Sequence, residues 1–221
     1  MLIQGVRLRE NDPIRKNTLY YLPQSRVIPY DEDDSGSVDI DFRLSEGQCG
    51  YYAHEYRPAT VPQQGAKKAD ITAFVVDEAG EKAKGCIYEV KKTVGGKNEL
   101  FDLCEQWMSA VKYWRHSIVS YLEECTVEEE IGVFTVNFEP ARIEAEIERL
   151  ERENAVDFDK VPLIVRGKMA LGNLKKYKEL EVLRDFLKCR FTYKEGMAIE
   201  RLTFKISKLD GKERHYLRLE I

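Results

Sequence analysis

Two acidic residues and a lysine, Asp70, Glu89 and Lys91, have the residue types and the spacing in this sequence that point most directly to chemistry. Glu89 and Lys91 belong to the run 86–93, whose composition predicts a β-strand. Because side chains alternate between the two faces of a strand, the carboxylate of Glu89 and the ammonium of Lys91 share one face. Burying such a pair costs desolvation free energy, and a functional site is one reason for its presence.

A second strand is predicted just before it, over residues 70–76. The polar, glycine-containing connection 77–85 joins the two strands into a β-hairpin, which brings Asp70 near Glu89. Two carboxylates held close together repel each other unless a cation lies between them. Oxygen ligands in this number suit Mg²⁺ or Mn²⁺, so we expect one of these ions at Asp70 and Glu89.

This constellation, followed by a predicted long helix over 98–122 and a predicted buried strand over 131–138, resembles the PD-(D/E)XK nuclease superfamily. The resemblance implies a restriction-endonuclease-like core and a Mg²⁺-dependent deoxyribonuclease, with bacterial or phage restriction or defence as the setting. It also implies that Asp70 and Glu89 bind the metal, with the backbone carbonyl of Val90 as a third ligand. Lys91 would then activate the attacking water and stabilise the charge on the phosphate.

The sequence departs from the family pattern at several positions. Ala69 replaces the proline that often precedes the first acid. The upstream glutamate of many members is expected at Glu55, with Glu46 as the second candidate. Some members carry a glutamine and a tyrosine one turn apart on the helix after the second acid. Here the tyrosine, Tyr113, lies two turns after Gln106, on the same helix face, which leaves Gln106 as a further candidate catalytic residue that would grip the substrate.

Contacts to a nucleic-acid backbone are expected from four lysines around the motif and from basic residues after Val161. The four are Lys67, Lys68, Lys92 and Lys97. Charge is unevenly distributed, with an acidic stretch over 98–160 and a basic stretch over 161–221, and on charge alone solvated helix and strand faces are the favoured explanation. The resemblance implies DNA as the partner, and the motif does not distinguish DNA from RNA. Because the sequence contains no recognisable reader module, target choice would depend on a homodimer or on a helicase- or ATPase-type partner.

Two other interpretations stay open. The chain could keep the nuclease fold as a catalytically silent module that binds nucleic acid or a partner protein. Alternatively, it is an α/β protein of unrelated function in which Glu89 and Lys91 form an ordinary ion pair on a hairpin. A second acid-x-lysine tripeptide begins at Asp210 and falls in a predicted turn, where it needs no function.

The pattern along the chain predicts an α/β fold, with a mixed central β-sheet flanked by helices. Residues 1–50 are expected to form a strand-rich N-terminal arm packed on an α/β domain over 51–221, in one globular unit. Asn98 is the expected cap of the first helix. The remaining expected elements are a helix over 140–153, a strand over 161–165, a helix that includes 174–187, and a C-terminal hairpin of 199–209 with 215–221.

Composition excludes several classes of protein. The chain has 221 residues, of which 43% are hydrophobic and 33% charged, with a net charge of −4, and this mix is globular. No apolar run is long enough to cross a membrane, and the first residues do not have the pattern of a signal peptide. Five scattered cysteines without a CxxC motif, and three histidines without an HExxH motif, argue against disulfide and zinc sites. We therefore expect a cytoplasmic protein without membrane contacts.

Overall fold

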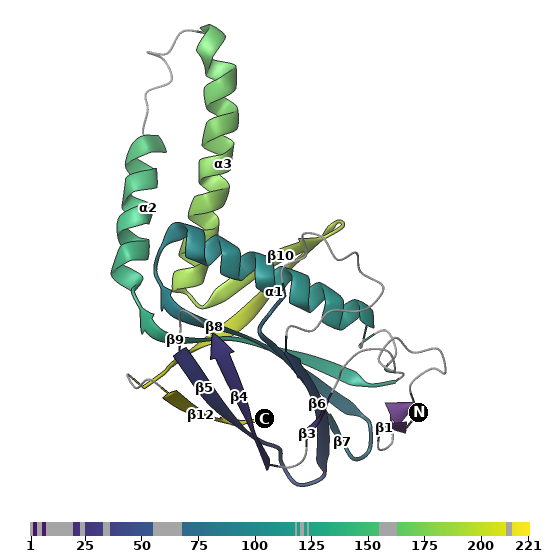
Figure 1. The fold of residues 1–221 in the computed structure, drawn as a ribbon. Helices are drawn as coiled ribbons and strands as arrows, with labels where there is room; N and C mark the ends of the chain where they lie inside the picture. The colour runs from purple at the N-terminus through teal and green to yellow at the C-terminus, as the bar shows by residue number, and fades with distance from the viewer. Residues whose placement is uncertain are drawn as a thin grey trace.

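The computed structural model describes residues 2–3, 6–7, 20–22, 25–32, 36–54, 68–117, 119, 122, 124–154, 163–210 and 214–221. In these ranges the protein has an α/β fold with a mixed central sheet, as predicted (Figure 1). A small three-stranded sheet accompanies the seven-stranded central sheet. The short strands β1 (Leu2–Ile3) and β2 (Val6–Arg7) pair only with each other in the described part.

The central sheet has the strand order β10-β11-β9-β8-β7-β6-β3. The predicted hairpin is present, because β7 and β8 are antiparallel neighbours. On the other side of β8, β9 is parallel to it, and a parallel pair requires a crossover connection, which here contains helix α1. The bounds are Tyr20–Leu22 for β3, Gln48–His54 for β6, Ile71–Asp77 for β7, Lys82–Val94 for β8, Thr126–Phe138 for β9, Arg190–Glu195 for β10, Ala198–Lys208 for β11 and Lys97–Ser117 for α1.

The three-stranded sheet covers one face of the central sheet. It is formed by β4 (Ser25–Glu32), β5 (Gly36–Arg43) and β12 (Arg214–Glu220), in the order β12-β5-β4. The core between the two sheets contains alternate residues of β5, β7 and β8, since every second side chain of a strand points to the same face. Strands from both ends of the chain therefore close this side of the molecule, and residue 50, the predicted end of the N-terminal arm, lies inside β6.

Helix α1 covers the other face, where its apolar stripe packs on β8, β9 and β11. Trp107 and Trp114 are fully buried in this core. Trp114 lies directly over Gly85 of β8, because a Cβ atom at that glycine would be 2.3 Å from Cε2 of the indole. Since Trp114 is near the end of α1 and Gly85 near the start of β8, the helix runs antiparallel to the strand. Glycine at position 85 allows this close approach of helix to sheet.

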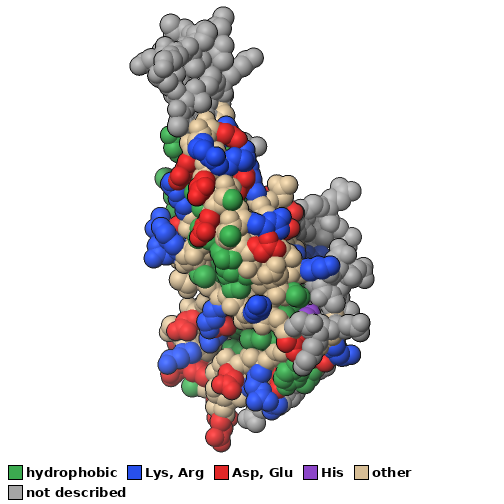
Figure 2. All heavy atoms as spheres, turned by 90° about the vertical axis from the view of Figure 1, so that its left-hand side faces the viewer, with side chains coloured by type: hydrophobic (Ala, Val, Ile, Leu, Met, Phe, Trp, Pro, Cys, Tyr) green, Lys and Arg blue, Asp and Glu red, His purple; other side chains and the backbone are tan. Residues whose placement is uncertain are grey.

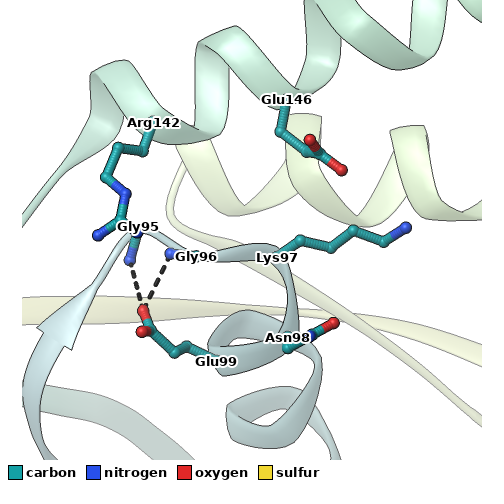
Figure 3. A pocket seen from close by; sticks show the side chains of 7 residues that line it. All are labelled: Gly95, Gly96, Lys97, Asn98, Glu99, Arg142 and Glu146. Atoms are coloured by element: carbon teal, nitrogen blue, oxygen red, sulfur yellow. Dashed lines mark hydrogen bonds between the residues drawn. The ribbon is translucent and has the colours of Figure 1, made fainter.

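The first turn of α1 differs from the predicted one. The carboxylate of Glu99 accepts hydrogen bonds from the backbone N–H groups of Gly96, at 2.9 Å, and Gly95, at 3.4 Å (Figure 3). Asn98, the expected cap, instead lies inside the first turn of a helix that begins at Lys97. Glu99 thus satisfies amide groups that a helix start would otherwise leave unpaired.

The helices α2 (Pro140–Asn154) and α3 (Leu163–Leu187) project together from the sheet (Figure 1). Ion pairs connect them, for example Lys176 with Glu153 at 2.8 Å. Acidic and basic side chains are mixed over this projection in the space-filling view (Figure 2). On the face that this view shows, charges of both signs therefore lie side by side instead of forming a patch of one sign.

Two of the strand predictions are wrong. The expected strand over 161–165 is helical in its described part, because α3 begins at Leu163. A short apolar, β-branched run does not distinguish a strand from the start of a helix, and the helical pattern that follows extends backwards over it. The expected C-terminal hairpin is absent, since β11 pairs with β9 and β10 while β12 pairs in parallel with β5.

The hairpin in this region is formed instead by β10 and β11, with Gly196 at a positive φ of 57° in the turn. A six-residue strand directly after a long helix gave too few alternating positions to be recognised. Helix α1 ends at Ser117, before the expected residue 122. None of the helices in the described ranges is long and apolar enough to cross a membrane.

Candidate functional site

The structure brings Asp70, Glu89 and Lys91 together at the middle of the central sheet. Ile71 pairs with Tyr88 across the β7–β8 hairpin, so the next pair outward places Asp70 directly opposite Glu89. Residues in direct opposition have side chains on the same face. Both acids are buried, with 7% of Asp70 and 0% of Glu89 exposed.

Two crossed hydrogen bonds hold the carboxylates in place. The backbone N–H of Asp70 donates to Oε2 of Glu89 at 3.1 Å, and the backbone N–H of Val90 donates to Oδ2 of Asp70 at 2.8 Å. In an extended strand, the N–H and C=O of one residue point to the same side. The carbonyl of Val90 is therefore directed towards the side on which Asp70 lies.

Lys91 follows on the same face of β8. Its Nζ donates to Oε1 of Glu89 at 2.6 Å, and 23% of its side chain is exposed. The ammonium is thus the most accessible charged group of the three, and it lies between the buried carboxylates and the surface.

The electrostatics of the site centre on Glu89. Burial, and next the negative charge of Asp70, raise the pKa of Glu89 to about 8, while Lys91 acts in the opposite direction. Two neighbouring carboxylates and one ammonium leave the buried cluster with a deficit of positive charge. The carboxyl of Glu89 therefore takes up a proton more readily here than it would in water.

This pKa shift predicts how stability depends on pH. Because the folded-state pKa of Glu89 lies above its ordinary value of 4.5, the stabilising contribution of the bound proton is fully present below pH 4.5 and is lost as pH rises to about 8. Glutamine resembles the protonated carboxyl and does not titrate. We expect the melting temperature of Glu89→Gln, relative to the wild type, to rise between pH 5 and 8 and then to level off. Thermal unfolding in EDTA at each pH checks this, and a difference independent of pH would contradict it.

Gln106 lies in the middle of α1, the helix that covers the face of the sheet to which Glu89 points by strand alternation. It is two turns before Trp114, or about 12 Å along the helix. Glu89 is four residues after Gly85, or about 13 Å along β8. Because Trp114 packs on Gly85 and the two elements are antiparallel, Gln106 is at the level of Glu89. Its Oε1 atom is buried and has no hydrogen-bond partner among the described residues.

Of the two candidate upstream acids, only Glu46 can be placed relative to this group. Glu55 lies outside the described residues. The residue before it, His54, is the last of β6 and pairs with Ile71, the neighbour of Asp70. Glu46 is exposed in the turn before β6, at the opposite end of β7. With seven residues of β7 between the two ends, Glu46 is on the order of 20 Å from Asp70.

The predicted nucleic-acid lysines lie in different surroundings. Lys68 is partly buried two residues before Asp70, and Lys67 lies outside the described residues. Lys92 is exposed, and strand alternation places it on the face opposite to Lys91. Lys97 forms an ion pair with Glu179 of α3 at 2.5 Å and lies over the ring of Phe101. Figure 3 shows its side chain extending beneath α2, beside a hollow of about 460 Å³.

Comparisons with protein-family models, with curated proteins and with solved structures found no match to this chain.

The donor set fits a hard divalent cation. Among the described residues, no group of three or more histidine, cysteine, aspartate or glutamate side chains gathers in one place, which argues against a closed zinc site in this part. Mg²⁺ instead accepts one or two carboxylates and retains several waters. The two opposed carboxylates of Asp70 and Glu89, together with the carbonyl of Val90, match that requirement.

Proposed function

We propose that the protein is a metal-dependent nuclease that hydrolyses DNA phosphodiester bonds, with a restriction-endonuclease-like core. Asp70, Glu89 and the carbonyl of Val90 would hold Mg²⁺ or Mn²⁺. The observation that carries the proposal is the burial of two opposed carboxylates directly beside the ammonium of Lys91. Such an arrangement is unfavourable without a cation and is suited to binding one.

The order of elements around the site supports the same proposal. The two acids and the lysine lie on a β-hairpin that continues through α1 into the parallel strand β9. This strand–strand–helix–strand order is the one that accompanies the motif in the PD-(D/E)XK nuclease superfamily. Since a fold supports many functions, the site residues and not the topology carry the assignment.

Each residue has a defined task in this mechanism. A bound divalent ion would supply positive charge to the phosphate and lower the pKa of a water. Asp70 and Glu89 would hold the ion, and the backbone N–H groups of Val90 and Asp70 fix the orientation of both carboxylates. The ammonium of Lys91 has three N–H donors, so it can stay bonded to Glu89 while it contacts a phosphate oxygen or the attacking water.

One observation favours a second candidate, a nuclease-fold module without catalytic activity. The direct bond of 2.6 Å between Lys91 and Glu89 is also what a purely structural ion pair would form. Such a module would bind nucleic acid or a protein and would have no need of a metal. Metal dependence therefore separates the two candidates.

The test measures cleavage and metal binding together. We expect the wild type to cleave supercoiled plasmid in Mg²⁺ or Mn²⁺ and not in EDTA, and to bind Mn²⁺ in calorimetry. Asp70→Asn removes one ligand charge but keeps the shape, and it is expected to lose both properties. Asp102→Asn, on the exposed side of α1, is the matched control and should behave as the wild type. Absence of Mn²⁺ binding in the wild type would rule out the proposed site.

A further inference from the structure

The β10–β11 hairpin extends beyond the sheet as a two-stranded ribbon. Strand β11 pairs with β9 only from Phe204 onward, whereas residues 198–203 pair with β10 alone in the described part of the chain. Figure 1 shows this hairpin projecting past α1. The ribbon is tethered at its base, because Phe191 and Tyr193 are buried in the core beneath α1.

Positive charge gathers on one face of the ribbon. Arg190 and Lys194 share a face of β10, and Arg201 lies on the same face of β11 because it pairs with Thr192. All three cations are exposed, and no ion pair joins them to a carboxylate of the described residues. Glu200 alternates to the other face, where it pairs with Arg115 at 2.5 Å.

The last turns of α3 add to this positive surface. A groove of about 620 Å³ separates them from the ribbon, and Lys178, Arg184 and Lys188 also line it. Two acids line it as well, and one of them, Asp185, already accepts a hydrogen bond from the hydroxyl of Thr192 at 2.8 Å. Six cations and two acids line the groove, and one of the cations, Arg184, is already paired with Glu151 of α2. The remaining excess of positive charge makes the groove suitable for a polyanion.

The tip of the ribbon is apolar and fully accessible. Met197, next to the turn glycine, is 99% exposed, and Ile199 is 68% exposed. Large apolar side chains are usually buried, and two of them at one exposed tip indicate a contact surface. An apolar tip next to a cationic face suits a ligand that has charged phosphates outside and apolar groups, such as thymine methyls, within its groove.

We propose that the β10–β11 ribbon enters the major groove of duplex DNA. This groove is about 12 Å wide and admits a two-stranded β-ribbon. Arg190, Lys194 and Arg201 would contact the phosphates, and Met197 would reach the base edges and thymine methyl groups. A second copy of the chain that paired along the β10 edge would bring the same cations of the two copies together, where they would repel one another. The choice of DNA as the occupant rests on the proposed function, although binding here needs no metal.

The test is a titration of a fluorescent 20-base-pair duplex in EDTA at several salt concentrations. All proteins carry Asp70→Asn, so that cleavage plays no part. Lys194→Glu with Arg201→Glu is expected to weaken binding at least tenfold. It should also reduce the slope of log affinity against log salt by about 2, since each phosphate contact contributes about 0.9. The control, Arg142→Glu with Arg152→Glu on α2, makes the same change in net charge and should alter the affinity less than twofold.

The outcomes distinguish this inference from the proposed function. Equal losses of DNA affinity in the ribbon variant and the control would mean that net charge alone explains the effect, and this would overturn the inference. The inference would also be overturned if the ribbon variant kept its affinity for DNA and instead dissociated a dimer in sedimentation. Met197→Ser should weaken DNA binding without changing the salt slope. An unchanged affinity would mean that the tip of the ribbon does not contact DNA. If the wild type does not cleave DNA but the ribbon variant loses binding, the ribbon inference stands and the nuclease proposal fails.

Discussion

Replacing Lys91 by methionine is expected to slow metal-dependent DNA cleavage by roughly 10²- to 10³-fold, the loss typical when one group that stabilises developing charge is removed. Methionine keeps most of the apolar stem and removes the ammonium. Because Lys91 contacts Glu89 at 2.6 Å and is the most accessible group of the site, it is placed to face both the carboxylates and a phosphate. Single-turnover rates at saturating Mn²⁺ measure the effect on the chemical step.

Metal binding should survive this substitution, because Asp70, Glu89 and the carbonyl of Val90 remain. The positive charge of Lys91 lowers the pKa of Glu89, so its loss raises that pKa further above about 8. We therefore expect the Mn²⁺ affinity of Lys91→Met, relative to the wild type, to be lower at pH 7 than at pH 9, because a proton competes more strongly for Glu89 at the lower pH. Calorimetry at the two pH values separates this electrostatic effect from a loss of the site.

The neighbouring residue supplies the control for this experiment. Lys92 has the same side chain, is exposed and lies on the opposite face of β8. This position puts Lys92 away from a phosphate bound beside Lys91, contrary to the contact expected from the sequence. Lys92→Met should therefore cleave DNA at a rate within twofold of the wild type. Equal losses for the two variants would mean that nonspecific attraction of DNA, and not a contact at the reacting phosphate, explains the role of Lys91.

The grouping of Asp70, Glu89 and Lys91 was predictable because it depends on local rules. Strand alternation fixes the shared face of Glu89 and Lys91, and a hairpin with a short connection fixes which residue lies opposite Glu89. Neither step requires knowledge of distant parts of the chain. The burial of the site could not be read from these residues, since it depends on α1 and on the packing of the whole sheet.

The contacts that sequence reasoning missed connect distant segments. Strand β12 pairs with β5, whose residues are more than 170 positions away, and nothing in its own alternation identifies that partner. The ion pair of Lys97 with Glu179 of α3 likewise joins distant segments, and nothing near Lys97 in the sequence identifies its partner. A local pattern specifies the type of an element and its faces, whereas the choice among partners of similar pattern is made by the packing of the complete fold.

The contact between Gly85 and Trp114 carries the second large prediction, because it sets the position of α1 over the site. A Cβ atom at position 85 would lie 2.3 Å from Cε2 and 2.5 Å from Nε1 of a fully buried indole. A rigid ring in a packed core cannot move aside cheaply. We therefore expect Gly85→Ala to lower the free energy of unfolding by about 3 kcal/mol, at the upper end of typical overpacking effects. Chemical denaturation measures it.

Gly172 provides the matched control, since a Cβ atom there meets nothing within 4 Å and the residue lies inside α3. Gly172→Ala should raise the free energy of unfolding by about 0.5 to 1 kcal/mol, because alanine favours the helix over glycine. Destabilisation by both substitutions would show that the loss of glycine itself, and not the clash, is responsible at position 85.

A double substitution then isolates the clash between the two residues. Trp114→Ala alone leaves a cavity and is expected to cost about 3 to 5 kcal/mol. In Gly85→Ala with Trp114→Ala, the new methyl group occupies space that the indole has left, so its own cost should largely disappear. The combined loss should therefore be smaller than the sum of the single losses by about 2 kcal/mol or more, within the range of coupling between contacting residues. Additive losses would mean that Gly85 is required for another reason, and the approach of α1 to β8 would need a different explanation.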